Sequence, residues 1–303
     1  MAQNNVLPQN NVLTQNNVLP QNNVLPQNNV LPQNNVMQTM GLKRNTIDKY
    51  YTKPVIAEQC LSAFKDNVVI GPNDYIIEPS AGNGAFIPGI KALTTNYYFY
   101  DLEPANDEII KKDYLKGDYS DMGNIHTIGN PPFGRQSSLA IQFIKISCKF
   151  SKSVSFILPK SFKKDSLKRA FPLTFHLVYE MDIPDNSFLV EGKEHNVPCV
   201  FQIWIKEAHN RKEIETLEPN HFIFVKKTEA PDISVRRVGV NAGAINTNTD
   251  QSIQSHYFIK FTNQKTVDEN IAQLMKIKYE FNNTVGPKSI SKQELIKEFI
   301  KVL

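Results

Sequence analysis

The chain has 303 residues, of which 41% are hydrophobic and 21% are charged, and its formal net charge is +4. This length allows one large domain with or without a smaller one, and the composition is typical of a soluble globular protein. No run approaches the roughly 18 consecutive apolar residues of a membrane helix, and no secretory signal is evident, so no membrane partner is expected. The mild positive charge permits a polyanionic partner without requiring one.

The three cysteines, Cys60, Cys148 and Cys199, are far apart in the chain. They form no CxxC pair and no Cys/His cluster with zinc-ligand spacing. We therefore expect no metal site. Reduced thiols in an intracellular compartment, the cytoplasm or the nucleus, are the simplest interpretation.

Residues 1–40 carry the repeat Gln-Asn-Asn-Val-Leu-Pro in six copies, two of them imperfect, and contain no charged residue. Proline in each period blocks a continuous helix, which favours a low-complexity tail without a catalytic role. A hexapeptide β-helix is the alternative. It needs about three stacked coils of three hexads each, and the repeat is too short for that.

Residues 41–206 have a globular composition and are expected to form one domain. Alternating strands and helices predict an α/β fold, a largely parallel sheet with helices on both faces. A loop and a helix occupy residues 46–65. The later predicted elements are strands at Tyr75–Ile77, Tyr97–Tyr100, Ile125–Ile128, Val154–Leu158 and Val200–Ile205, and helices at Ala85–Leu93 and Ser138–Phe150.

Residues 207–303 show a different pattern and are expected to form a small α+β appendage. The predicted elements are strands at His221–Val225, Ile233–Val238 and Tyr257–Phe261, and helices at Val267–Phe281 and Lys292–Val302.

A glycine-containing loop joins the first predicted strand to the next helix, with the sequence Glu78-Pro79-Ser80-Ala81-Gly82-Asn83-Gly84-Ala85-Phe86. Ligands of open α/β sheets bind at such strand ends, and Gly82 and Gly84 let the backbone approach a ligand closely. The loop lacks the third glycine of a dinucleotide fingerprint and the Gly-Lys-Ser/Thr of a phosphate loop. An acid before the loop suits a ligand with a cationic amino-acid end. A plain strand-helix turn is the alternative.

Two further acids stand near later strand ends. Asp101 ends the second strand, where a carboxylate can accept hydrogen bonds from both ribose hydroxyls, and Glu103 competes for this role. Asp113, before the next strand-like segment, is placed to receive an adenine amino group. A solvated strand-end acid is the alternative for each.

The tetrapeptide Asn130-Pro131-Pro132-Phe133 follows the strand Ile125–Ile128. The Asn130 amide oxygen and the Pro131 carbonyl oxygen can accept hydrogen bonds from the two N–H groups of a planar exocyclic amine. These bonds aim the nitrogen lone pair at a sulfonium methyl. The prolines, Pro132 included, hold these acceptors in place before reaction. Phe133 offers a surface for stacking a planar substrate. A rigid proline turn with a buried phenylalanine is the alternative.

Taken in this order, Glu78–Phe86, Asp101, Asp113 and Asn130–Phe133 resemble the motifs of Rossmann-like amino-methyltransferases that use S-adenosylmethionine. The segment Tyr51-Thr52-Lys53-Pro54 is similar to the Tyr-Thr-Pro start of N6-adenine DNA methyltransferases with the gamma motif order, except that Lys53 is inserted. The resemblance covers about residues 46–206.

The resemblance implies a role for each matched position. Tyr51 and Thr52 would flank the methionine end of the cofactor, with Glu78 and Gly82 near it. Asp101 would hold the ribose, and Asp113 and Tyr114 the adenine. The cofactor-binding set is Tyr51, Thr52, Glu78, Pro79, Ala81, Gly82, Gly84, Asp101, Asp113, Tyr114 and Asn130, and the catalytic set is Asn130, Pro131, Pro132 and Phe133.

Several residues are candidates for substrate contacts. The resemblance also implies a second aromatic that packs on the base from a later loop, for which Phe188 is the candidate, with ordinary core packing as the alternative. The predicted helix Lys160–Arg169 carries five cations, and Lys160 and Lys163 are candidates for phosphate contacts. A solvated helix face is the alternative. Arg236 and Arg237 are candidates for a second nucleic-acid contact.

We therefore expect methyl transfer from S-adenosylmethionine to the N6 amine of adenine, in DNA rather than RNA. Within the same enzyme class, RNA adenine and protein glutamine remain open as acceptors. A non-catalytic cofactor-binding subunit of a methyltransferase pair is the alternative from another class, although such a subunit need not keep the Asn130 loop intact.

Overall fold

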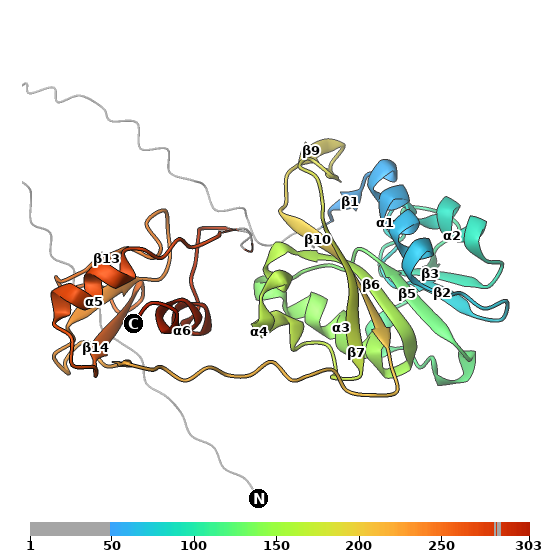
Figure 1. Cartoon of the computed structure of the whole chain (residues 1–303). Helices are drawn as coiled ribbons and strands as arrows, with labels where there is room; N and C mark the ends of the chain where they lie inside the picture. The colour runs from blue at the N-terminus through green and yellow to red at the C-terminus, as the bar shows by residue number, and fades with distance from the viewer. Residues whose placement is uncertain (1–48, 282, 284–285) are drawn as a thin grey trace, which may run out of the picture. The chain divides into compact units, whose positions relative to one another are not determined.

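The computed structural model describes residues 49–281, 283 and 286–303 (Figure 1). The tail predicted for residues 1–40 lies outside the described residues. None of the helices in the described part of the chain is both long and apolar enough to cross a bilayer.

A seven-stranded sheet is the centre of residues 51–206, in the order β4-β3-β2-β5-β6-β10-β7 (Figure 1). Adjacent strands from β4 to β6 are parallel, whereas β10 is antiparallel to both β6 and β7. This confirms the predicted α/β fold and its mostly parallel sheet. The strands are β2 (Tyr75–Glu78), β3 (Tyr97–Asp101), β4 (Ile110–Lys111), β5 (Ile125–Gly129), β6 (Ser151–Pro159), β7 (Phe175–Asp182) and β10 (Cys199–Lys206).

Three helices cover the two faces of this sheet. They are α1 (Pro54–Asn67), which starts on a proline suited to a first helical position, α2 (Ile87–Leu93) and α3 (Ser138–Phe150). Successive side chains of a strand point to opposite faces, so Ile76 joins a core with α1 and α2 while Ile77 joins a core with α3. The sheet is therefore buried on both sides, as parallel sheets require.

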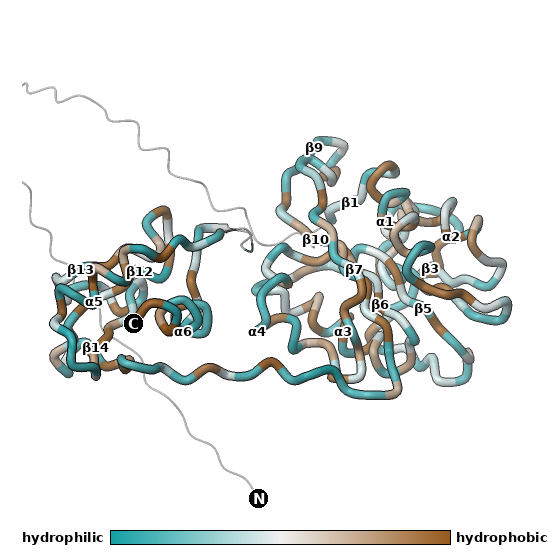
Figure 2. The backbone as a smooth tube through the Cα atoms, viewed as in Figure 1, coloured by the Kyte–Doolittle hydropathy of each residue, from teal (hydrophilic) through white to brown (hydrophobic). Residues whose placement is uncertain are grey.

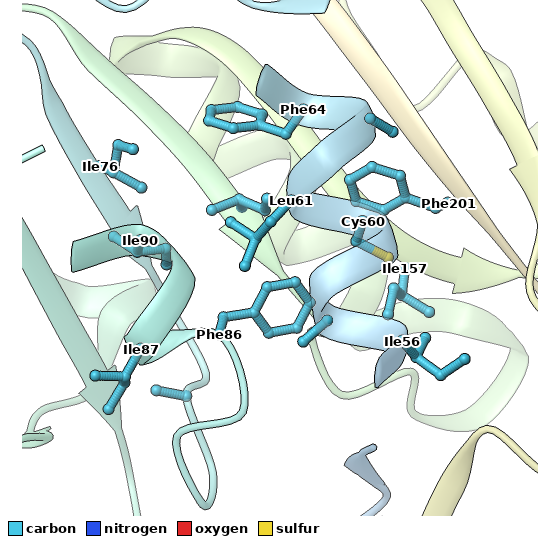
Figure 3. Packing of buried hydrophobic residues seen from close by; sticks show 14 of the residues in the cluster. Ile56, Cys60, Leu61, Phe64, Ile76, Phe86, Ile87, Ile90, Ile157 and Phe201 are labelled. Carbon is cyan, nitrogen blue, oxygen red and sulfur yellow. The ribbon is translucent and has the colours of Figure 1, made fainter. Parts of the chain in front are cut away.

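Figure 3 shows the core around α1, where Cys60 lies on the side of Ile157 of β6 and Phe201 of β10, and Leu61 and Phe64 point to the side of Ile76 and Ile90. All three cysteines of the chain are buried and unpaired. Burial raises the pKa of each thiol above its ordinary value, so these cysteines act as small apolar core residues.

Two smaller sheets complete the described part of the chain. One has the order β1-β8-β9, with β1 (Tyr51–Thr52), β8 (Phe188–Val190) and β9 (Lys193–His195), and the hydrophilic β9 hairpin is teal in Figure 2. The other has the order β11-β14-β12-β13, with β11 (Phe222–Phe224), β12 (Ile233–Arg236), β13 (Ile245–Asn246) and β14 (His256–Phe261). It shares a third core with α5 (Val267–Leu274) and α6 (Lys292–Ile300).

Two predicted helices differ from the structure. The stretch Lys160–Arg169 is a 3-10 turn (η4, Lys160–Lys163) followed by the four-residue α4 (Asp165–Lys168), because Lys164 between them is extended and Phe162 is buried. The helix predicted to end at Phe281 stops with α5 at Leu274. Beyond it, Tyr279 packs so close to Gly243 that a Cβ there would lie 2.7 Å from its ring, so tertiary packing replaces the helix.

A buried polar network joins strands at the sheet end where β2 and β5 begin. His126 places Nδ1 2.8 Å from Ser153 Oγ and Nε2 3.1 Å from Asp74 Oδ2. Burial raises the pKa of Asp74, but bonds from the Gly71 amide, Asn124 and His126 outweigh it and lower that pKa to about 2. Burial also lowers the pKa of His126. The network is fully satisfied and enclosed, which is typical of a structural role.

Candidate active site

A cavity of about 250 Å³ opens where β2, β3 and β5 end. Carboxyl ends of parallel strands are the usual ligand position in such sheets. The lining residues that the sequence predicts as site residues are Tyr51, Pro79, Gly82, Asp101, Asp113, Tyr114, Asn130, Pro131, Pro132 and Phe133. The structure therefore brings most of the predicted cofactor and catalytic residues to one cavity.

The glycine loop is held against the ends of β3 and β1. The Gly82 amide donates to Asp101 Oδ2 at 2.8 Å, and the Ala81 amide donates to the Tyr100 carbonyl at 2.8 Å. Gly82 has φ +57°, and a Cβ there would lie 3.0 Å from the Tyr51 ring. This position requires glycine for both its backbone angle and its space. Of this loop, Ala81 and Gly84 support the turn behind the cavity rather than line it.

Glu78 ends β2 and is buried with 2% of its surface exposed. Its Oε2 has no hydrogen-bond partner among the described residues. Burial, and secondly the charge of Asp101, raise the pKa of Glu78 to about 8. Gly129 permits this packing, since a Cβ there would lie 3.1 Å from Glu78 Cγ. Glu78 itself does not line the cavity, although the next residue, Pro79, does. The buried Oε2 is left without a cationic or hydrogen-bonding partner among the described residues.

Asp101 and Asp113 both line the cavity but differ in what they contact. Asp101 accepts one backbone bond on each oxygen, from Gly82 and from Glu103, and each oxygen keeps a further lone pair. Glu103 forms an ion pair with Lys49 and its pKa is lowered by that hydrogen bond. This pairing leaves Asp101 as the freer acceptor.

Asp113 does not precede a sheet strand as predicted. It follows β4 and caps the 3-10 helix η1 (Tyr114–Lys116), accepting the Leu115 amide at 3.1 Å and pairing with Lys116 at 3.0 Å. Further 3-10 turns lie at η2 (Ser120–Met122) and η3 (Arg135–Ser137).

Tyr114 is buried, its hydroxyl is 2.8 Å from Ser147 Oγ, and its ring stacks on Phe143, so it forms a wall of the cavity.

Asn130 has a fixed side-chain orientation. Its Nδ2 donates to the Tyr50 carbonyl at 3.2 Å and to Thr52 Oγ1 at 3.1 Å. A carbonyl can only accept, so the amide nitrogen must face Tyr50. Asn130 Oδ1 is consequently left buried without a donor among the described residues. Thr52, predicted to flank the cofactor, contacts Asn130 instead and is buried outside the cavity lining.

Further contacts of the loop Asn130–Phe133 hold the Asn130 backbone and the Phe133 ring in place. Ser80 Oγ donates to the Asn130 carbonyl at 3.1 Å. Phe133 lines the cavity and packs against both cores of the central sheet. The following residues Gln136 and Ser137 have φ of +52° and +62°, which is unusual for residues with a Cβ. Such strain is commonly found at functional loops.

Apart from Phe133, the substrate candidates lie outside the cavity lining. Phe188 is in strand β8 rather than a loop, and it is 1% exposed because it packs in the core under α1. Lys160 and Lys163 both pair with Asp182, at 3.5 and 2.8 Å.

The two candidate arginines belong to the four-stranded sheet and its surroundings. Arg236 donates to the Val238 carbonyl at 3.1 Å, and the Arg237 guanidinium lies 5.4 Å from the centre of the Tyr257 ring. They are therefore not part of the cavity.

Sequence reasoning missed several lining residues. Leu139 and Phe143 come from the first turns of α3, four residues apart and hence on one helix face. The four-residue spacing of these two apolar residues, directly after the Asn130 loop, was the sequence signal that could have identified them as lining residues. Lys49, Tyr50, Leu102 and Lys112 also line the cavity, and no sequence pattern distinguishes them.

Neither a protein-family model nor a curated protein sequence matches the chain. Solved structures do superpose on it. A Pyrococcus horikoshii protein, provisionally described as an RNA methyltransferase, is 14% identical with a TM-score of 0.41, over 55% of this chain and 91% of that chain.

A Listeria monocytogenes protein, provisionally described as a class I S-adenosylmethionine-dependent methyltransferase, is 12% identical with a TM-score of 0.42, over 58% of this chain and 67% of that one. A type I restriction-modification methyltransferase subunit from Streptococcus thermophilus is 11% identical with a TM-score of 0.37, over 75% and 53% of the two chains.

Proposed function

We propose that this chain transfers a methyl group from S-adenosylmethionine to the exocyclic N6 amine of adenine in DNA. The observation that carries the proposal is the buried Asn130 Oδ1, an acceptor with a fixed orientation and no donor among the described residues. An unsatisfied buried acceptor costs about 1–3 kcal/mol, and a substrate N–H would satisfy it.

The cavity, and the buried Glu78 that directly precedes its lining residue Pro79, fit the proposed cofactor. Its cationic amino group is a suitable partner for Glu78, whose buried oxygen lacks one. Asp101 retains acceptor capacity for the two ribose hydroxyls, and Gly82 leaves room for the ligand beside Tyr51. Apolar side chains such as Phe143 offer a surface for the adenine ring. When bound, the cofactor supplies an electrophilic methyl group on a sulfonium sulfur.

The Asn130 loop would activate the acceptor amine. Asn130 Oδ1 and the Pro131 carbonyl oxygen accept hydrogen bonds from its two N–H groups, which frees the nitrogen lone pair to attack the methyl carbon. Both prolines restrict the loop, so the two acceptors are positioned before the substrate arrives. Transfer would break the methyl–sulfur bond and leave its electron pair on the sulfur, and the methylated nitrogen would then return to neutrality by releasing a proton to water. Phe133 would stack on the base and hold its plane in line with the methyl group.

The choice of adenine in DNA rests on the motif order from Tyr51 to Phe133, which resembles the gamma arrangement of DNA methyltransferases. Residues 207–303 would then assist target recognition, with Arg236 and Arg237 as phosphate contacts, and residues 41–206 would form the catalytic domain. Both arginines also have a partner within the chain, since Arg236 donates to the Val238 carbonyl and Arg237 lies over the Tyr257 ring.

The test is an acceptor assay on the full chain with methyl-labelled cofactor. Duplex DNA, single-stranded DNA, RNA and cell protein are incubated separately, digested, and searched for the methylated species. We expect N6-methyladenine in DNA. Label found only in RNA, or only on protein glutamine, would reassign the acceptor. Cofactor binding without transfer to any of them would indicate a non-catalytic subunit.

A further inference from the structure

Two histidines and a glutamate meet outside the cavity, where β7 begins and β10 ends. His176 lies in β7, opposite Ile205 of β10, and Glu207 and His209 follow β10 directly. One carboxylate oxygen of Glu207 is 3.8 Å from His176 Nδ1, and the other is 3.3 Å from His209 Nδ1. The three donor atoms all lie within 4.8 Å of one another.

A hydrogen bond fixes which nitrogen of His176 faces the glutamate. His176 Nε2 is 3.0 Å from the His209 carbonyl oxygen, which can only accept, so Nε2 carries the proton. In the neutral ring, Nδ1 then presents its lone pair to the Glu207 carboxylate. A metal ion between these two electron-rich atoms would be favourable for both. A histidine that donates its other N–H to a backbone carbonyl is also the usual arrangement of a metal ligand.

The surrounding backbone is firmly held. The Glu207 amide donates to the Thr174 carbonyl at 2.8 Å, and the Arg211 amide donates to the Leu173 carbonyl at 2.8 Å. The Arg211 guanidinium donates to four backbone carbonyls between residues 168 and 175. The ligand-bearing segment is thus fixed to the edge of the sheet, while the His209 side chain is exposed and contacts His176 and Glu207.

We propose that His176, Glu207 and His209 bind one divalent zinc ion. Two imidazole nitrogens and one carboxylate form a donor set that zinc prefers, with a fourth position left for water. Zinc bonds of about 2.0–2.1 Å place tetrahedral donors about 3.3 Å apart. The Glu207–His209 pair already has this separation, and modest side-chain rotations would bring the other donor pairs, which lie within 4.8 Å, to the same distance. The ion would hold the segment after β10 against β7, and it has no part in the proposed methyl transfer.

The test is calorimetric titration of the tag-free, chelator-treated full chain with Zn²⁺ alone. We expect one saturable site in the wild type. His176→Gln and Glu207→Gln should each abolish it, while His195→Gln, which changes an exposed histidine elsewhere, should leave it intact. The proposal is wrong if the wild type shows no saturable binding, or if the Gln variants at 176 and 207 bind as the wild type does.

A second measurement separates lost binding from lost folding. Trp204 is the only tryptophan of the chain and is buried in β10, paired with Leu177 next to His176. Bound Co²⁺ should quench its emission in the wild type and in His195→Gln, but not in Glu207→Gln. An unchanged emission maximum in Glu207→Gln would show that the sheet is intact. Equal quenching in all three proteins would overturn the proposal.

Discussion

Replacing Glu78 with glutamine should change how the stability of the cofactor-free protein depends on pH. The carboxyl is buried at the end of β2 and its pKa is raised from 4.5 to about 8. In the unfolded chain Glu78 loses its proton near its ordinary pKa, whereas in the folded chain it keeps the proton until about pH 8. Between these values the folded state binds more protons, so the free energy of unfolding falls as the pH rises.

The magnitude follows from the two pKa values. The difference between 4.5 and about 8 corresponds to roughly 5 kcal/mol at full ionisation. From pH 5 to pH 8 the wild type should lose about 3–4 kcal/mol relative to Glu78→Gln. The buried amide of the variant carries its own cost, but that cost does not depend on pH. The change in the difference between the two proteins is therefore the quantity that isolates the carboxyl.

The assay is urea unfolding at pH 5, 6, 7 and 8, followed by the fluorescence of Trp204, which lies in the same sheet as Glu78. Cofactor affinity measured between pH 6 and 7.5 provides the complementary test. Pairing with an ammonium group favours the ionised carboxyl, so wild-type affinity should rise with pH by up to about tenfold per unit, and the variant should lack this slope. Parallel stability curves for the two proteins would refute the assignment of a protonated, buried Glu78.

Three further variants test other parts of the molecule. Gly82→Ala should weaken cofactor binding because its Cβ meets the Tyr51 ring, while Gly192→Ala, also at positive φ but with nothing within 4 Å, should not; equal affinities in a titration would contradict this. Asp74→Asn should lower the free energy of unfolding by roughly 2 kcal/mol at pH 7 and by less at pH 3. The stabilisation by the ionised carboxylate is fully present above pH 3.8 and is lost as the pH falls through about 2. Urea unfolding that gives the same difference at both pH values would argue against this assignment. Phe133→Leu should keep cofactor affinity but weaken DNA binding in fluorescence anisotropy by about 1–3 kcal/mol, the contribution of one stacked base, and unchanged DNA affinity would rule out stacking.

Most of the central fold could be predicted because its elements have strong local patterns. The helix predicted at Ser138–Phe150 has the same bounds in the structure, and the strand at Ile125–Ile128 differs by one residue. Strand β7 was missed because most of its residues are only partly buried at the sheet edge, which removes the apolar run of a central strand. The division of the chain into two domains between residues 206 and 207 stays a prediction.

The site residues that could be predicted likewise have local sequence patterns, and those that could not be predicted lack them. Asp101, Asn130 and Phe133 could be located because each follows a strand, and strand ends converge at one edge of a parallel sheet. The roles of Thr52 and Phe188 depend on the β1-β8 pairing, which joins segments more than 130 residues apart and leaves no local pattern. The His176–Glu207–His209 cluster was missed for the same reason, since His176 and His209 are 33 residues apart.

The most direct test of the account compares methyl transfer by the wild type with transfer by Asn130→Ala. Asn67→Ala serves as the matched control, since Asn67 also donates to a backbone carbonyl, but at the end of α1 outside the cavity. Loss of one preorganised acceptor should reduce N6-methyladenine formation in DNA by about 10²–10³-fold or more, with cofactor affinity close to that of the wild type. Wild-type turnover by Asn130→Ala would contradict the role of the Asn130 loop, and with it the proposed function.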